Sequence, residues 1–261
     1  MRIIVTGKGG TGKTTVASIM GFQLSNMGYH VLLMDADSYP NLAQSLGLPR
    51  EFSEKIIPLT KNDELIRERT GAAPGEGWGI FFSLTPKVDD LVDKLGIKIN
   101  ESLRLVVVGG IEEPKEGCMC PAIALAKVFL RHVLLTEKDI VIVDSEAGLE
   151  VFGRGLAEYF DRNICVAEPT IKSLDACKQI FDFSEKLEVK ENILALNKVK
   201  DLSVVDKLLG KVFTNTPPYF VIRHDPLIEK IEQIGAGVES LRNTIVWQDV
   251  EKLCMYTLKG R

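Results

Sequence analysis

The sequence predicts an α/β fold in which a single doubly wound, mostly parallel sheet carries helices on both faces. Apolar segments of strand length alternate along the 261 residues with amphipathic segments of helical period. Several of the strand segments are apolar throughout, as is typical of parallel strands that are covered on both faces. A glycine-rich segment directly after the first strand is the third observation, because such a segment joins a strand to a helix in phosphate-loop proteins.

The expected strands and helices follow one another in the order that this architecture requires. The strands are expected near residues 2–6, 30–34, 104–108, 139–143, 163–167, 193–196 and 219–222. The helices are expected near residues 14–27, 121–134, 170–186, 201–209, 225–234 and 244–258. Prolines and glycines make residues 49–100 the least regular part, and no repeat or low-complexity linker divides the chain. We therefore expect one domain over residues 1–261, with an irregular insertion at about 49–100.

The composition bears on the possible partners and on location. The 32 Lys and Arg residues against 36 Asp and Glu residues give a net charge of −4, and no long basic run favours a nucleic-acid partner. The longest apolar stretches, such as residues 140–143, are far shorter than the roughly 20 residues of a membrane helix, so no membrane partner is expected. The first strand begins at residue 2 and leaves no room for a signal peptide, which predicts a cytoplasmic location.

The segment Gly7–Thr15 satisfies the phosphate-loop pattern G-x-x-x-x-G-K-[ST], with a strand before it and a helix after it. Glycines let the backbone curl and point its N–H groups at phosphate oxygens. We expect Lys13 to contact the outer phosphates, the Thr14 hydroxyl to bind Mg²⁺, and Thr15 to reach the inner phosphate. The alternative, a plain glycine-rich turn, leaves the matching context unexplained. The predicted nucleotide-binding residues are Gly9, Gly10, Thr11, Gly12, Lys13, Thr14 and Thr15.

Two carboxylates, Asp35 and Asp37, follow the second expected strand. They come at the carboxyl end of that strand, where ligands of open α/β sheets bind. Asp35 is expected to hold a water on magnesium, and Asp37 to orient the attacking water or accept its proton. The alternative is that one of them only caps the next element, since Asp is a common N-cap and turn residue.

A third carboxylate, Asp144, ends the most hydrophobic strand segment, residues 140–143. An aspartate in this place of a phosphate-loop protein is the Walker B residue, which binds the magnesium shell. Gly148 completes a D-x-x-x-G pattern, and its backbone N–H can sense the terminal phosphate and so couple nucleotide state to shape. Three charged residues in or after this segment are either signalling contacts or solvated charges: Glu146, Glu150 and Arg154.

A C-x-C pair, Cys118 and Cys120, lies in a loop after an apolar strand. Two thiolates one residue apart can bind one soft or borderline metal ion, but they leave it half coordinated. A homodimer with this loop on its twofold axis would supply four sulfurs. The alternative is two inert cysteines packed as small apolar residues, as we expect for Cys165 and Cys177. Five cysteines at irregular spacing do not predict a disulfide framework.

The string Lys8–Thr15 resembles the deviant phosphate loop of the ATPase family that includes MinD and the nitrogenase iron protein. In that family the extra lysine reaches across a homodimer to the partner's nucleotide. The resemblance implies that Lys8 acts in trans, that the nucleotide is ATP, and that Asp37 serves hydrolysis beside Lys13. It also implies that Asn197 contacts the base, for which a turn-forming asparagine is the alternative.

A narrower resemblance is to the CooC-type accessory ATPases of carbon monoxide dehydrogenase maturation. It rests on Cys118–Pro121, on Arg131 with His132, and on segments 86–90, 144–148 and 153–155. The resemblance implies a slow ATPase and nickel chaperone whose C-x-C pairs bind Ni²⁺, or Zn²⁺ in vitro, at the interface of a nucleotide-dependent homodimer. Its client would be carbon monoxide dehydrogenase or a related nickel enzyme such as acetyl-CoA synthase.

The chain departs from this family pattern in two places. Residues 38–40, Ser-Tyr-Pro, interrupt an expected Asp-Pro-Asn run, and the segment ending Arg223-His224-Asp225 replaces an expected Ile-Pro-Tyr-Asp near the base. The first departure bears on hydrolysis, and the second bears on the fit around adenine.

Two other classes of function remain open. A MinD- or ParA-like positioning ATPase would need a basic amphipathic tail or a basic DNA-binding face. The tail, residues 247–259, has apolar residues at roughly helical spacing but only two lysines, so we expect it to pack on the sheet. An iron–sulfur carrier reductase like the nitrogenase iron protein would need well-separated cysteines in two loops.

Overall fold

The computed structural model describes residues 1–74, 83–110, 120–132, 139–146 and 159–259. Its centre is an eight-stranded sheet in the order β3-β4-β2-β5-β1-β6-β7-β8. All neighbouring strands run parallel except β3 and β4, which are antiparallel. The predicted doubly wound, mostly parallel sheet is therefore confirmed. The strands are β1 (Arg2–Thr6), β2 (His30–Ala36), β3 (Ile97–Lys98), β4 (Leu103–Val107), β5 (Asp139–Ser145), β6 (Arg162–Ala167), β7 (Glu191–Val199) and β8 (Tyr219–Arg223).

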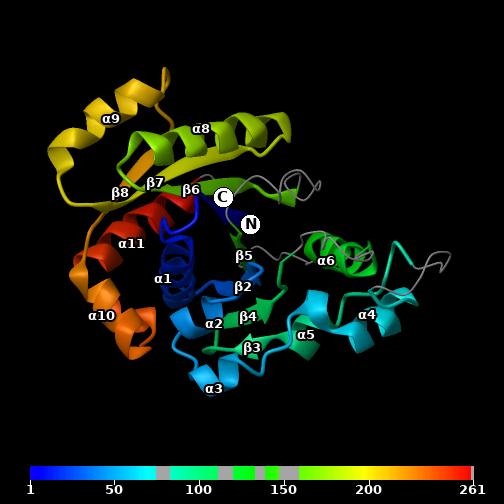
Figure 1. Ribbon diagram of the computed structural model, residues 1–261. Helices are drawn as coiled ribbons and strands as arrows, with labels where there is room; N and C mark the ends of the chain where they lie inside the picture. Colours follow the sequence, from blue (N-terminus) through cyan, green and yellow to red (C-terminus); the bar gives the residue numbers. More distant parts are fainter. Residues whose placement is uncertain (75–82, 111–119, 133–138, 147–158, 260–261) are drawn as a thin grey trace.

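Helices cover both faces of this sheet (Figure 1). The α-helices are α1 (Lys13–Asn26), α2 (Leu42–Ser45), α3 (Arg50–Ser53), α4 (Asp63–Thr70), α5 (Leu91–Leu95), α6 (Cys120–His132), α8 (Ile171–Lys186), α9 (Val205–Val212), α10 (Pro226–Ile234) and α11 (Ile245–Thr257). Among the described residues, 3₁₀ turns occur at η1 (Leu59–Lys61), η3 (Leu202–Val204) and η4 (Val238–Leu241).

Two hydrophobic cores lie on the two faces of the sheet. Successive side chains of a strand point to opposite faces, so Ile4 packs with α6 and α8 while Ile3 packs with α1 and α11. The strand β5 divides in the same way, with Val141 in the first core and Ile142 in the second. This double burial explains why the central strands are apolar at consecutive positions, as in Ile3–Val5 and Ile140–Val143.

The structure adds elements where the sequence showed no clear period. Residues 49–100 contain α3, η1, α4 and α5 and end in the antiparallel edge strand β3. The helix expected at 201–209 begins as the 3₁₀ turn η3 and becomes α9 only at Val205. Both η1 and α4 pack against α6, so these two elements belong to the same layer as that helix.

The C-terminal segment packs on the body of the protein, as predicted. Helix α11 contacts α1 and β8, and Val246, Val250 and Leu253 are buried in the core beneath it. The search for membrane-spanning segments found no helix of sufficient length and apolarity among the described residues.

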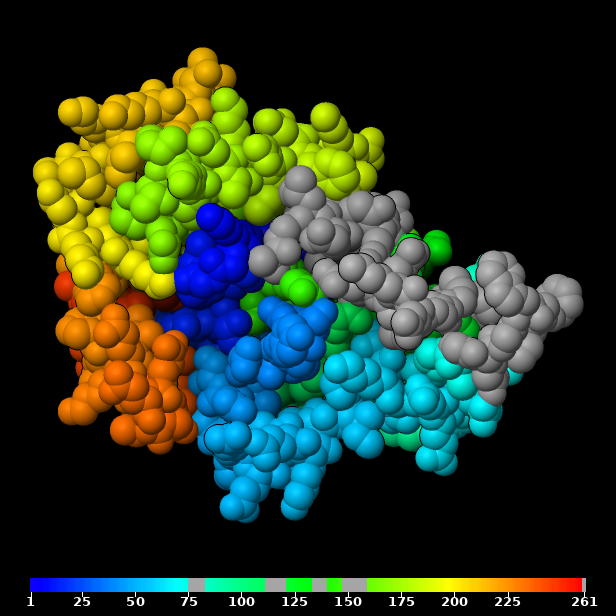
Figure 2. Space-filling model, viewed as in Figure 1, coloured from blue at the N-terminus to red at the C-terminus, as the bar shows by residue number. Residues whose placement is uncertain are grey.

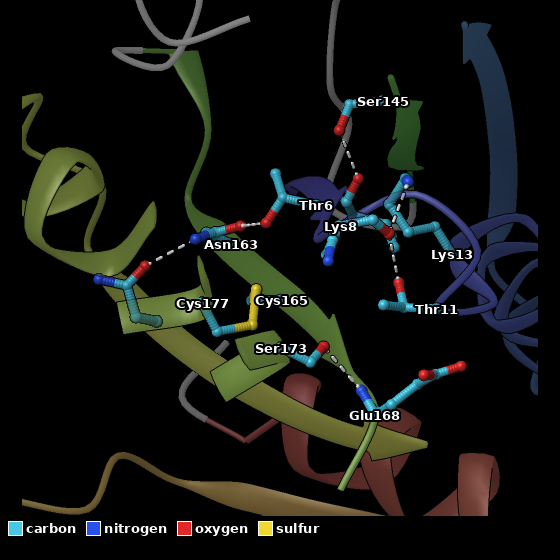
Figure 3. Close-up of a disulfide and its surroundings, with 12 residues drawn as sticks. Thr6, Lys8, Thr11, Lys13, Ser145, Asn163, Cys165, Glu168, Ser173 and Cys177 are labelled. Carbon is cyan, nitrogen blue, oxygen red and sulfur yellow. Dashed lines mark hydrogen bonds between the residues drawn. A yellow bond between two sulfur atoms is a disulfide. The ribbon is translucent and has the colours of Figure 1, made fainter. Parts of the chain in front are cut away.

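Our interpretation of Cys165 and Cys177 as inert thiols was wrong in one respect. Both side chains are buried, but their sulfurs form a disulfide that joins β6 to α8 (Figure 3). Their Cα atoms lie 5.9 Å apart, within the range that a disulfide spans. The number and spacing of cysteines gave no indication of this pair, because the contact depends on how α8 crosses β6. Among the described residues, Cys254 is a free and buried cysteine.

Candidate functional site

The phosphate loop runs from the end of β1 to the start of α1, as the sequence predicts. Three of its glycines have positive φ angles: Gly7 at +134°, Gly10 at +79° and Gly12 at +93°. A Cβ atom on Gly7 would overlap the Val166 carbonyl of β6, so only glycine fits there. The loop closes on itself because the Thr11 hydroxyl donates a 2.9 Å hydrogen bond to the Lys8 carbonyl. The backbone has the shape of an anion-binding nest.

Two side chains near the carboxyl end of β7 hold this loop from the outside. The Asn197 Nδ2 donates to the Thr11 carbonyl at 2.8 Å, and the Lys198 Nζ donates to the Gly10 carbonyl at 2.7 Å. The Lys198 ammonium also pairs with Glu168 at 2.7 Å. Sequence analysis missed Lys198 and Glu168, because nothing local relates them to the phosphate loop.

The Asn197 amide is already engaged in this structure. Its Oδ1 accepts the Lys198 backbone N–H at 2.9 Å, in addition to the contact that its Nδ2 makes with Thr11. A side-chain amide has two N–H donors and two oxygen lone pairs, so one of each remains for a base. The predicted base contact of Asn197 therefore stays a prediction, while its bond to the phosphate loop is observed.

Lys13 and Thr14 begin α1 and face the acidic strand ends. Lys13 is buried, and burial lowers the pKa of its ammonium, while Asp144, Asp37 and Glu146 act in the opposite direction. The Thr14 hydroxyl donates a 2.6 Å hydrogen bond to Asp144 Oδ2. The structure thus brings the predicted phosphate and magnesium residues together.

Asp35 and Asp144 lie directly opposite each other on β2 and β5. Both are buried, and desolvation raises the pKa of Asp35 to about 6 and that of Asp144 to about 7, with Asp35 as a further cause for Asp144. Within the described part of the chain, Asp144 Oδ1 is buried without a hydrogen-bond partner. An orphaned carboxylate oxygen beside a threonine hydroxyl is the donor set that Mg²⁺ prefers, so these residues fit a magnesium ion.

Asp35 also shapes the loop that follows it. Its Oδ2 accepts the Leu42 N–H at 2.9 Å, and its Oδ1 accepts the Asp37 N–H at 3.2 Å. Asp37 in turn accepts the Tyr39 N–H at 2.9 Å, which is the turn-forming role that we considered as the alternative. Asp37 nevertheless lines a cavity beside the phosphate loop, which we call the nucleotide cavity. The bond to Tyr39 therefore leaves the predicted catalytic role of Asp37 open.

The cavity at this edge of the sheet has a volume of about 550 Å³. Its lining joins the phosphate loop and the carboxylates of Asp37 and Glu146 to Asn197, Lys198 and the turn between β8 and α10. Figure 2 shows the dark blue N-terminal segment at the surface between light blue and orange segments, and the orange one contains α10. A second cavity, of about 430 Å³, is lined by His30 and Ile140 at the opposite edge, away from every predicted site residue.

Lys8 lies at the rim of this site. Its side chain is exposed, and no hydrogen bond or ion pair engages its ammonium in the parts of the chain that the structure covers (Figure 3). Its backbone carbonyl is used inside the loop, where it accepts from Thr11 and, at 3.4 Å, from Lys13 Nζ. The Lys8 ammonium is therefore available to a group outside the described part of the chain.

Several predicted residues fall outside the described part. Gly148, Glu150, Arg154 and Cys118 lie in undescribed segments, and of Cys120 only its backbone at the start of α6 is described. In the rest of the chain, no three His, Cys, Asp or Glu side chains form a group that could hold a metal ion.

The segment that leads toward these cysteines leaves the sheet beside the nucleotide site. The backbone N–H groups of Val108 and Gly109 donate to the Asp35 carbonyl at 2.8 and 3.0 Å. Gly110 lies against Ser38, and a Cβ atom on Gly110 would come within 2.9 Å of the Ser38 Cα. Any shift of residues 35–38 would therefore displace residues 108–110, where the chain leaves β4 toward Cys118 and Cys120.

Comparison with known proteins agrees with this geometry. The family model of the CobQ/CobB/MinD/ParA nucleotide binding domain matches residues 2–250. This protein belongs to that nucleotide-binding family, and membership implies a nucleoside triphosphatase.

Within the family, two relatives are informative. An uncharacterized ATP-binding protein of Methanocaldococcus jannaschii is 37% identical over 99% of this chain and 98% of its own length. The carbon monoxide dehydrogenase accessory protein CooC of Rhodospirillum rubrum is 39% identical over 76% of this chain and 74% of its own.

Solved structures confirm the fold. A ParA family ATPase from Chlorobium tepidum superposes with a TM-score of 0.70 at 18% identity, covering 97% of both chains. The MinD cell division protein of Aquifex aeolicus gives a TM-score of 0.67 at 19% identity, covering 100% of this chain and 97% of its own.

Proposed function

We propose that this protein is an ATP-dependent metallochaperone that binds and delivers nickel during maturation of carbon monoxide dehydrogenase or acetyl-CoA synthase. The observation that carries the proposal is the contact between the Asp35–Ser38 segment and residues 108–110, which lead toward Cys118 and Cys120. Through it, a change at the nucleotide can reach the C-x-C pair. The similarity to the CooC accessory protein supports the nickel client.

In this proposal two subunits bind ATP face to face. The exposed Lys8 of each subunit reaches the triphosphate of the other, and a cation supplied in trans contributes on the order of 10³ to 10⁵ in rate. The same twofold axis brings two C-x-C pairs together, so that four sulfurs complete one metal site. Dimerisation thereby serves both hydrolysis and metal binding.

In the proposed hydrolysis, the residues that act on ATP are residues that line the nucleotide cavity or contact its lining. Backbone N–H groups of Gly9–Thr15 and the Lys13 ammonium hold the phosphates. Thr14 and Asp144, which are already joined by a hydrogen bond, would hold Mg²⁺, and the ion would supply positive charge beside the phosphate oxygens. Asp37 orients the attacking water, and loss of the terminal phosphate then releases the Asp35–Ser38 segment. Reopening of the dimer splits the shared sulfur site and frees the nickel.

Nickel binding is expected to depend on pH. Only the thiolate form of cysteine binds a metal, and a free cysteine has a pKa of about 8.5, so proton and metal compete. Affinity for nickel should therefore fall as the solution becomes more acidic, and binding should release protons.

Anaerobic titration with Ni²⁺, with and without a non-hydrolysable ATP analogue and followed by size-exclusion chromatography, tests the proposal. We expect the analogue to raise both the dimer fraction and the nickel affinity, and Cys118→Ser to lose stoichiometric nickel. Cys254→Ala is the control, because Cys254 is a buried free cysteine of α11 and not a member of the C-x-C pair. A Cys118→Ser variant that still dimerises with its full complement of nickel would rule out the C-x-C site.

A MinD- or ParA-like positioning ATPase is the alternative within the same family. Such a protein would need a membrane- or DNA-binding surface, and the apolar side of α11 is already packed on α1 and β8. Sedimentation with anionic liposomes in the presence of ATP separates the two functions. Co-sedimentation that depends on ATP would favour the positioning ATPase.

A further inference from the structure

Asp249 on helix α11 has a buried carboxylate that accepts several hydrogen bonds from Arg223. Its Oδ2 accepts the Arg223 Nε at 2.7 Å and the Arg223 backbone N–H at 3.2 Å, and its Oδ1 accepts Arg223 Nη2 at 2.7 Å. Lys252 adds a 3.0 Å contact to Oδ1. Only 2% of the Asp249 side chain is exposed, although Arg223 and Lys252 reach solvent. A bidentate contact of this kind fixes the plane of a guanidinium as well as its position.

Burial of an aspartate this deep needs a compensating partner. Desolvation alone would raise the pKa of Asp249, but the hydrogen bonds from Arg223 and Lys252 outweigh it, so its pKa is lowered. The carboxylate is therefore charged and fully engaged at neutral pH. Its main partner, Arg223, is the last residue of β8 and lines the nucleotide cavity.

The two residues after Arg223, His224 and Asp225, line the same cavity as the phosphate loop. The His224 N–H donates to the Val199 carbonyl at 2.9 Å, and the Asp225 carboxylate caps α10 by accepting the Leu227 N–H at 2.9 Å. The loop glycines and Lys13 take the phosphates. The turn Arg223–Asp225 adds a guanidinium and an imidazole to the part of the lining outside the phosphate loop, and the planes of both groups stack well on purines.

This turn has little support from the sheet itself. Strand β8 is an edge strand that pairs only with β7, and its register with β7 is interrupted between Leu196 and Val199. An edge strand at an irregular ladder is held by fewer backbone bonds than a central one. The contact between Asp249 and Arg223 therefore holds the end of β8 to helix α11.

We propose that Asp249 is a positioning residue for nucleobase recognition, which holds Arg223 and thereby sets the Arg223–Asp225 turn against the base. Affinity for the base then depends on the C-terminal helix, which contributes no side chain to the lining of the cavity. The inference rests on nucleotide binding alone, so it stands or falls separately from the nickel function.

Affinities for Mg-ADP and for magnesium pyrophosphate, measured by competition against a fluorescent ADP analogue, separate the base from the phosphates. Asp249→Asn keeps the size of the side chain but turns an amide N–H toward the guanidinium. We expect the ADP affinity to fall roughly 10-fold, as for a misplacement of well under 1 Å at a binding group, with the pyrophosphate affinity unchanged. Lys252→Ala is the matched control, because it removes the exposed contact to Oδ1 and leaves the Arg223 fork intact; we expect wild-type values for both ligands.

Arg223→Lys provides a second variant should Asp249→Asn fold poorly. It keeps the charge and a partly exposed side chain but loses the bidentate contact, so the ratio of ADP to pyrophosphate affinity should fall as well. Equal loss of affinity for both ligands, or an unchanged ratio in both variants, would overturn the proposal, since a purely structural role for Asp249 cannot distinguish a nucleotide from its phosphates.

Discussion

The Ser38 hydroxyl donates a 2.7 Å hydrogen bond to the Glu146 carboxylate and so joins the loop after β2 to the loop after β5. Ser38 follows Asp37 directly, and Glu146 comes two residues after Asp144. The same serine lies against Gly110 at the exit of β4. The Ser38 side chain therefore connects its own loop to two others at the carboxyl edge of the sheet.

Replacing Ser38 by alanine should uncouple these loops while sparing the phosphate loop. A hydrogen bond to a charged group contributes about 1.5 to 3 kcal/mol, so we expect steady-state ATP hydrolysis to slow by roughly 10-fold or more. The dissociation constant for Mg-ADP should stay within about 2-fold, because Ser38 is not part of the cavity lining. Turnover and equilibrium binding measure the two effects independently.

Ser203→Ala is the matched control for that variant. Ser203 donates a 2.7 Å hydrogen bond to the exposed carboxylate of Asp201, so the substitution removes the same kind of bond between two residues that do not line the nucleotide cavity. Ser38→Thr, which retains a hydroxyl, should recover part of the rate. Equal rates for Ser38→Ala and the wild type would show that the bond to Glu146 has no part in turnover.

Lys8→Ala should leave nucleotide binding to the single subunit almost intact and should reduce hydrolysis by about 10³-fold, the lower limit for a cation supplied in trans. The exposed side chain of Lys8 explains the first expectation, since its ammonium makes no contact with the described part of its own loop. Lys207→Ala removes an equally exposed lysine on α9 and should have no effect. Nucleotide affinity and phosphate release are the measurements.

Mixing two inactive variants tests the direction of the Lys8 contact. A dimer of one Lys8→Ala subunit and one Asp37→Asn subunit has a single pocket that combines an intact Asp37 with a lysine from the other chain. Activity should therefore reappear on mixing. If Lys8 served its own pocket, no pocket in the mixed dimer would be complete, and the mixture would stay inactive.

The sheet could be predicted because its evidence is local. Each central strand is apolar at consecutive positions, and both faces of these strands are in fact buried, as for Ile3 and Ile4. The short elements α3, α5 and β3 could not be predicted, since segments of two to five residues are stabilised by what they pack against rather than by their own period.

The same distinction separates the predicted from the unpredicted parts of the site. The phosphate loop and Asp144 are marked by glycine spacing and by a strand end, which a reader of the sequence can see. Lys198 meets the Gly10 carbonyl across 188 residues and Glu168 across 30, and no periodicity encodes such a contact. Only the strand order of the sheet brings them together.

The stability of the protein should depend on pH through Asp35 and Asp144. Their pKa values, about 6 and about 7 in the folded chain, lie above the ordinary value of 3.8, so the folded chain binds protons that the unfolded chain has released. Without Mg²⁺, the free energy of unfolding should fall as the pH rises from about 4 to about 7, by about 1.4 kcal/mol for each unit of pKa shift. Denaturant titrations in the presence of a chelator at several pH values measure this slope.

Asp144→Asn should remove most of that dependence, because the variant carries no ionisable group at the most shifted position. At pH 8 and without Mg²⁺, we expect the variant to be more stable than the wild type by on the order of 2 kcal/mol. Mg²⁺ with ADP should stabilise the wild type and have much less effect on the variant. A wild-type stability that rises between pH 4 and 7 would contradict the assignment.

The disulfide between Cys165 and Cys177 should stabilise the folded chain, because it closes a loop over a sequence separation of 12 residues. The chain-entropy relation for a loop of this length gives about 3 kcal/mol. Cys177→Ala, or a dithiol reductant, should lower the free energy of unfolding by this order in denaturant titrations. Cys254→Ala is the control, since removing the free cysteine leaves the effect of the reductant unchanged. Alkylation of the unfolded wild type without reductant should label all but two of the five cysteines, and labelling of all five would show that the bond is absent.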